Sequence, residues 1–159
     1  IIKLMLIKWL WEWKKKKKID ASTAILFNHD SVFRNKKFLL PKLVKSFANK
    51  DFKFIKDIYE LNVNGDFSHA EDICDGIYKL SITKKKIDML ILSSGKRFYI
   101  NKIIDYLEKQ FQYNIKKKYS DKKLNHRIIG SNKLAVKLIN YKSLKSPINA
   151  CKEILKNYL

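Results

Sequence analysis

The sequence has little glycine, proline, cysteine or arginine, and each scarcity excludes a class of protein. Four glycines and two prolines in 159 residues exclude a collagen-like or linker-rich chain. The two cysteines, Cys74 and Cys151, stand far apart with no CxxC spacing, and no HExxH motif is present. We therefore expect unpaired thiols, no metal site, and a reducing, cytoplasmic compartment.

The scarcity of arginine bears on the formal net charge of +20. Arginine occurs only at Arg34, Arg97 and Arg127, so nearly all of the 35 basic residues are lysine. Guanidinium groups, which bind bases and phosphates in a bidentate way, are thus almost absent. Because lysine is accompanied by abundant isoleucine and asparagine, we interpret the positive charge as a compositional bias rather than as selection for binding a polyanion. A basic module that binds nucleic acid or a membrane surface remains the alternative.

What the chain does have is an apolar share of 46%, enough for one domain with a core. Its first residues predict a helix over 1–18, whose apolar stretch is shorter than the roughly 20 residues that cross a bilayer. A helix lying on lipid, with three tryptophans and a lysine tail, is a second interpretation. Helical periodicity puts Lys3 on the face of Leu6, Ile7 and Leu10, so we expect Lys3 to point inward, unless it snorkels at a frayed end.

Farther along, short apolar runs alternate with helical patterns, which predicts an α/β fold. We expect helix 70–82 to face inward through Ile73, Ile77 and Leu80. The predicted elements are a strand at 22–27, a helix at 38–48, strand-like 52–55 and 58–63, a helix at 70–82, a strand at 88–92, a turn at 93–95, a helix at 101–111, a solvated strand and loop through 116–123, a helix at 132–138 and a final helix opened by Ser146-Pro147.

Two polar boxes, Phe27–Ser31 and Asp66–Asp72, are each predicted where an apolar element ends. In and after the first box, Asn28, His29, Arg34 and Lys42 fall within 15 residues of one strand end. The end of a parallel strand followed by a helix N-terminus offers free N–H groups and a positive dipole. These residue types therefore indicate an edge that handles an anion. No GxSxG motif supports a hydrolase.

These residues resemble a known family, the extended short-chain dehydrogenase/reductases, and among them the GDP-mannose 4,6-dehydratases. The family's Asn-His-Glu-Ser box, arginines and Phe-Val-x-x-Lys segment are similar to Asn28-His29-Asp30-Ser31, Arg34 and Phe38-Leu39 with Lys42. Its Arg-Asp-Trp-Gly-His-Ala-x-Asp segment resembles the second box. The closing Gly-x-x-x-Lys-Ala pattern resembles Gly130 and Lys133 with the final helix.

The resemblance implies the C-terminal part of an NAD(P)-binding Rossmann-type fold with a small α/β substrate-binding lobe. Residues 1–35 would be late Rossmann elements, and 36–159 mainly the lobe with a returning Rossmann strand and helix. Lys3 would be the catalytic lysine of the Tyr-x-x-x-Lys pair and would bind the nicotinamide ribose. Lys3, His29 and Arg34 would contact NADP, and Asn28 and Lys42 the nucleotide sugar.

The chain departs from the family in what it lacks. The glycine-rich dinucleotide loop and the catalytic tyrosine are absent, and Gly65 stands where an arginine that clamps pyrophosphate is expected. We therefore expect a fragment of an NADP-dependent nucleotide-sugar 4,6-dehydratase that is inactive alone and lacks the N-terminal half of the fold. An epimerase or reductase of the same family is the alternative. We also expect an exposed sheet edge and apolar patch where the missing strands belong, and a homo-oligomer is left open.

Overall fold

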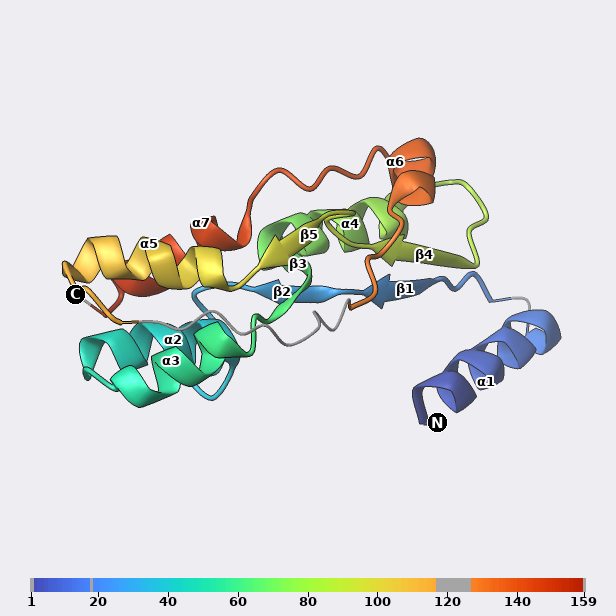
Figure 1. Ribbon diagram of the computed structural model, residues 1–159. Helices are drawn as coiled ribbons and strands as arrows, with labels where there is room; N and C mark the ends of the chain where they lie inside the picture. The colour runs from blue at the N-terminus through green and yellow to red at the C-terminus, as the bar shows by residue number, and fades with distance from the viewer. Residues whose placement is uncertain (1, 18, 117–126, 159) are drawn as a thin grey trace.

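The computed structural model describes residues 2–17, 19–116 and 127–158, which form helices and short strands in alternation (Figure 1). The elements are α1 (Ile2–Lys17), β1 (Thr23–Leu26), β2 (Asn28–Asp30), α2 (Leu39–Ala48), α3 (Phe52–Glu60), β3 (Asn64–His69), α4 (Ala70–Ile82), β4 (Met89–Leu92), β5 (Arg97–Tyr99), α5 (Asn101–Phe111), α6 (Lys133–Ile139) and α7 (Pro147–Lys156).

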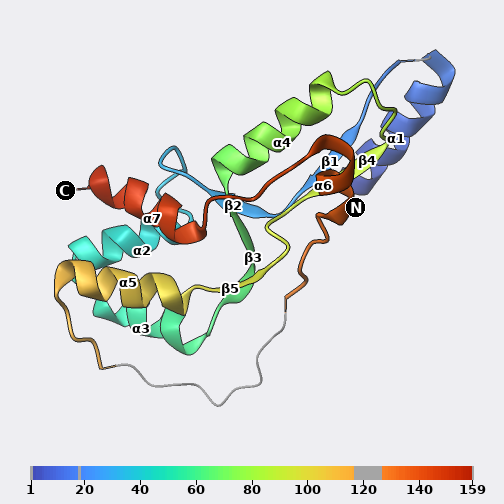
Figure 2. The ribbon, with the colours of Figure 1, turned by 90° about the horizontal axis from the view of Figure 1, so that it is seen from above.

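The strands form two small sheets joined where β1 runs on into β2 (Figure 2). β1 pairs with β4 in parallel, with Thr23 opposite Met89. β2 pairs with β3 in parallel, and β3 pairs with β5 antiparallel. Because parallel strands need a crossover, α2 and α3 lie between the paired strands β2 and β3. Helix α4 then leads from β3 to β4, which lies beside β1. The predicted α/β fold is confirmed.

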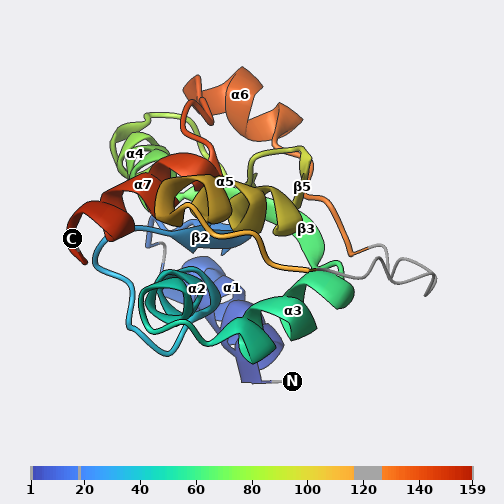
Figure 3. The ribbon, with the colours of Figure 1, turned by 60° about the vertical axis from the view of Figure 1, so that its left-hand side comes forward.

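Two apolar clusters hold the helices to the sheets. The larger lies among α2, α3, α5 and α7, where Phe47, Ile55 and Leu107 are fully buried. Figures 1 and 3 show α5 and α7 on one side of this cluster and α2 and α3 on the other. The smaller cluster joins α4 and α6 to β4 through Ile73 and Leu92.

The helices predicted with a capping residue or a clear apolar face are confirmed. α4 begins after His69, whose ring nitrogen accepts the Glu71 N–H, and α7 begins at Pro147 after Ser146. In α7 the N–H and hydroxyl of Ser146 both donate to Asn149 Oδ1, at 2.9 and 2.8 Å. The predicted strand and loop through 116–123 lies largely outside the described residues.

The prediction of strands at 52–55 and 58–63 is wrong, because residues 52–60 form α3. The Asp51 carboxylate caps this helix by accepting the Phe54 N–H. Phe52, Ile55 and Tyr59 recur at helical spacing, and the latter two are buried against the larger cluster. Isoleucine and aromatic residues have a strand preference, but the cap and the periodicity outweigh it.

Three short strands also went unpredicted. The first box is itself β2, and β3 takes up 64–69 instead of ending before the second box. β5 forms after the 93–95 turn. Ile77, expected to face inward, is 42% exposed. Ile73 and Leu80 belong to the smaller cluster and Ile77 does not, so Ile77 lies on the side of α4 that faces away from it.

Helix α1 is present as predicted but stands apart from the rest (Figure 1). None of its described residues is buried. Lys14 links it to the rest of the chain, since its Nζ lies 2.8 Å from both the Ala21 carbonyl and Asp88 Oδ1. The prediction that Lys3 points inward is wrong in this structure, because Lys3 is exposed and only Ile7 and Leu10 on its face are half-buried. Ile2, Met5, Leu6 and Trp9 form an exposed apolar patch on this helix. No described helix is long and apolar enough to span a membrane.

Candidate functional site at the β2–α2 edge

Asn28 and His29 both lie on β2, and each has one side-chain atom fixed by a backbone carbonyl. Asn28 is exposed, and its Nδ2 donates to the Asp66 carbonyl at 3.2 Å. His29 Nδ1 lies 2.8 Å from the Phe27 carbonyl, and because a carbonyl only accepts, Nδ1 carries the proton. The Asn28 Oδ1 and the His29 Nε2 are thereby left as acceptors for a ligand.

Arg34 is held by two neighbours in the loop that follows β2. Its Nε lies 3.3 Å from Asp30 Oδ1, and its guanidinium stacks 3.7 Å over the Phe38 ring. Burial raises the pKa of Asp30, and the charges of Arg34 and His29 offset this only in part. The guanidinium therefore serves the loop itself, with its terminal nitrogens left toward solvent.

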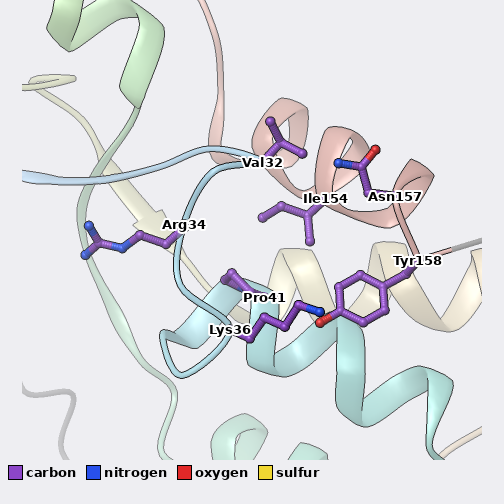
Figure 4. Close-up of a pocket in the computed structure, with 7 residues that line it drawn as sticks. All are labelled: Val32, Arg34, Lys36, Pro41, Ile154, Asn157 and Tyr158. Carbon is purple, nitrogen blue, oxygen red and sulfur yellow. The ribbon is translucent and has the colours of Figure 1, made fainter.

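A cavity of about 320 Å³ opens between this loop and α7 (Figure 4). In Figure 4 Lys36 reaches toward Tyr158 across its floor, whereas Arg34 extends from the loop in the opposite direction. Lys36 Nζ lies 5.6 Å from the centre of the Tyr158 ring. The lining residues are Val32, Arg34, Lys36, Pro41, Ile154, Asn157 and Tyr158.

A second, more basic cavity of about 350 Å³ lies beside the first, at the α2–α3 corner. Lys42 lines it, and its ammonium group stacks 4.1 Å over the Phe54 ring. Lys36 lines both cavities, so Arg34 and Lys42 border adjoining hollows. Asn28 and His29 line neither, and Lys3 lies on the separate α1. The lining residues are Lys36, Lys37, Lys42, Lys45, Ser46, Asn49 and Asp51.

The second box proves to be a structural junction rather than part of a cavity with the first. Asp66 is fully buried on β3. Its Oδ1 accepts the N–H and hydroxyl of Ser94, at 2.8 and 2.7 Å, and its Oδ2 accepts the N–H groups of Gly95 and Gly130, at 3.0 and 3.1 Å. One carboxylate thus joins β3 to the turn after β4 and to the segment before α6. The aspartate next to a glycine gave no sign of this in the sequence.

Later residues of the box bind the C-terminal part of the chain. His69 Nε2 lies 3.0 Å from Glu153 Oε2 on α7, and Asp72 accepts the Lys145 N–H at 2.8 Å. Lys145 also pairs with Glu71; this hydrogen bond lowers the pKa of Glu71 and raises that of Lys145. Within the described ranges no three acidic, histidine or cysteine side chains are placed to hold a metal ion.

Solved structures similar to this one share its fold. RMD from Pseudomonas aeruginosa complexed with NADPH matches with a TM-score of 0.79 at 17% identity, over 98% of this chain and 53% of that one. UDP-glucuronic acid 4-epimerase from Bacillus cereus in complex with NAD matches at 0.74 and 16%, over 94% and 47%. The dTDP-glucose 4,6-dehydratase DesIV from Streptomyces venezuelae, with NAD and TYD bound, matches at 0.69 and 12%, over 92% and 46%.

The chain thus spans about half the length of these structures, and its fold is that of the Rossmann-type epimerases and dehydratases. Residues 2–145 match the model of the family described as GDP-mannose 4,6 dehydratase, and the chain belongs to that family. This confirms the resemblance drawn from the Asn28–Lys42 segment. A search of curated protein sequences gave no match.

Proposed function

We propose that this chain is the substrate-binding, C-terminal portion of an NADP-dependent nucleotide-sugar 4,6-dehydratase that acts on a GDP-mannose-like substrate. The family match over residues 2–145 is the observation that carries the proposal. It includes the box at 28–31 together with Arg34 and Lys42. The described geometry supports it, because β2 and the loop after it lead directly into a basic face.

On the substrate side, Asn28 and Lys42 are the proposed contacts. Asn28 Nδ2 is fixed on the Asp66 carbonyl, so its Oδ1 is oriented to accept a hydrogen bond from a sugar hydroxyl or a base. Lys42 is held over the Phe54 ring and adds a point charge for a phosphate. Lys36, Lys37 and Lys45 share its cavity and raise the local positive potential.

On the cofactor side, the residues present do not make a complete NADP site. The four glycines, Gly65, Gly76, Gly95 and Gly130, are isolated from one another, so the chain has no GxGxxG loop for the pyrophosphate. His29, Arg34 and Lys3 are the proposed cofactor contacts, and Lys3 the proposed catalytic group. Each would act only when the rest of the Rossmann fold covers them. We expect the chain alone to bind nucleotide sugar and to catalyse no dehydration.

Binding to the purified chain tests the substrate proposal directly. Isothermal titration with GDP-mannose, GDP and UDP-glucuronic acid should show binding of the two guanine ligands, weakened in Lys42→Ala. The charge-matched control is Lys109→Ala, an exposed lysine on α5. A chain that binds none of these ligands contradicts the proposal.

The alternative within the family is an epimerase acting on a UDP sugar. It is favoured by the solved relatives, two of which are named as UDP-sugar 4-epimerases. The same titration separates the two, because preferential binding of UDP-glucuronic acid over GDP-mannose would support the epimerase.

A further inference from the structure

Helix α1 carries an apolar face that stays exposed in the described part of the chain. Ile2, Leu6, Trp9 and Trp13 recur at helical spacing on this α1 face, with Met5 beside them. Their exposed fractions run from 43% for Trp13 to 75% for Ile2, and the ring centroids of Trp9 and Trp13 lie 5.1 Å apart. A contiguous exposed apolar surface of this kind marks a place where a partner or a membrane is contacted.

The rest of the molecule contacts a different side of α1. The half-buried residues of the helix are Ile7, Leu10 and Lys14, which recur at spacings of three and four residues. The Lys14 ammonium also makes the contact to Asp88. Figure 1 shows the helix standing apart from the sheets. A surface can therefore cover the α1 face without breaking the contacts that link the helix to the chain.

The C-terminal end of the α1 face is positively charged. Lys16 and Lys17 follow Trp13 by three and four residues, which places both on the side of the helix that carries this tryptophan. Both are exposed, and within the described ranges neither takes part in an ion pair. Lys15, by contrast, lies 3.7 Å from Glu12, the one acidic residue of the helix. The α1 face thus combines apolar side chains, indole rings and unpaired ammonium groups.

From this combination we propose that α1 binds the surface of an anionic membrane and lies parallel to it. The apolar and indole side chains enter the boundary between headgroups and acyl chains, and the ammonium groups contact lipid phosphates. A helix of 16 residues is about 24 Å long, too short to cross the hydrocarbon core.

Charge and polarity favour anionic lipid over the other occupants of such a face. A second copy of this chain carries the same formal net charge of +20 and is repelled. Nucleic acid attracts the lysines but offers no apolar layer for Ile2 and Leu6. The inference does not depend on the proposed function, because α1 contributes none of the proposed substrate contacts.

Flotation of the purified chain with lipid vesicles tests the inference. We expect binding to vesicles of phosphatidylglycerol and phosphatidylcholine in equal parts, and far weaker binding to pure phosphatidylcholine. Leu6→Ser should weaken binding about tenfold or more, because a leucine is lost from the α1 face. The matched control is Leu4→Ser, a similarly exposed leucine off that face, which should change binding little.

The charged end is tested in the same way. Lys16→Gln/Lys17→Gln should weaken binding about twentyfold, because two ammonium contacts to anionic lipid are lost. Lys102→Gln/Lys109→Gln removes the same charge from exposed positions on α5 and should have a much smaller effect. Far-UV circular dichroism checks that each variant keeps the fold.

The tryptophans give a second readout that reports the orientation of the helix. Trp9 and Trp13 lie on the α1 face, whereas Trp11 lies off it. On anionic vesicles the fluorescence of the chain should shift to the blue. Most of this shift should disappear in Trp9→Phe/Trp13→Phe and persist in Trp11→Phe.

Several results would overturn the inference. These are no binding of the wild type to anionic vesicles, equal binding to pure phosphatidylcholine, or equal losses in Leu6→Ser and Leu4→Ser. Without vesicle binding, a dimer that Leu6→Ser abolishes would assign the α1 face to a second copy, and binding to random-sequence DNA would assign the lysines to nucleic acid. None of these results bears on the nucleotide-sugar site, which the titration above tests separately.

Discussion

Replacing Asp66 with asparagine should cost a large part of the stability of the fold. The Asp66 carboxylate is fully buried and accepts four hydrogen bonds. Asparagine keeps one oxygen, so its amide group would face either the Ser94 donors or the N–H groups of Gly95 and Gly130. Two donors are then left without this acceptor, and a buried donor without a partner costs about 1–3 kcal/mol. The Gly130 N–H is buried, whereas the Ser94 and Gly95 donors are only partly buried and regain part of that cost from water. We expect a loss of about 1–4 kcal/mol, against a typical total of about 5–15 kcal/mol.

Urea unfolding followed by far-UV circular dichroism measures this loss. Tryptophan fluorescence is a poor reporter, because all three tryptophans lie on α1, which has no buried residue. The matched control is Asp75→Asn, which removes the same charge from a partly exposed pair with Lys79 and should change stability by less than about 1 kcal/mol. If Asp66→Asn unfolds at the same urea concentration as this control, the carboxylate is not the junction described.

Three further predictions follow from particular side chains. Burial raises the pKa of Cys151 to about 12, so a thiol reagent at pH 8 should label the exposed Cys74 quickly and Cys151 only on unfolding; equal rates would contradict the burial. The pKa of Asp30 is raised in the folded state, so the protonated carboxyl stabilises the fold most below its ordinary pKa, and this contribution is lost as the pH rises through the raised value. Asp30→Asn should therefore reduce the slope of the unfolding free energy against pH in that range. An unchanged slope would refute this. If the charge is a compositional bias, the protein should not be retained on random-sequence DNA at about 0.15 M salt, whereas salt-sensitive retention would favour the nucleic-acid module.

Where local signals agreed, the sequence predicted the fold well. Helices α4 and α5 begin and end as expected, since a polar box, a regular apolar face and a turn bound them. The prediction from sequence was wrong where the strand preference of the residues and their helical spacing disagreed. This is the case in α3, whose isoleucine and aromatic residues favour a strand although they recur at helical spacing. It also missed β2 and β5, three-residue strands that exist only because β3 lies between them.

Sequence patterns could identify only those candidate site residues that lie close together along the chain. Asn28, Arg34 and Lys42 lie in one continuous segment, and a pattern along the chain can reveal such a group. The junction at Asp66 depends on the close approach of Gly130 to Phe27, which joins residues about a hundred positions apart, and no pattern along the chain reveals it. The inward orientation of Lys3 assumed a neighbour for α1 that the described residues do not provide.

A crystal structure of the protein with GDP-mannose tests the central claim most directly. The account predicts the nucleotide sugar at the β2–α2 edge, with Asn28 Oδ1 and Lys42 in contact with it. A ligand bound elsewhere, such as on the apolar face of α1, would contradict the account.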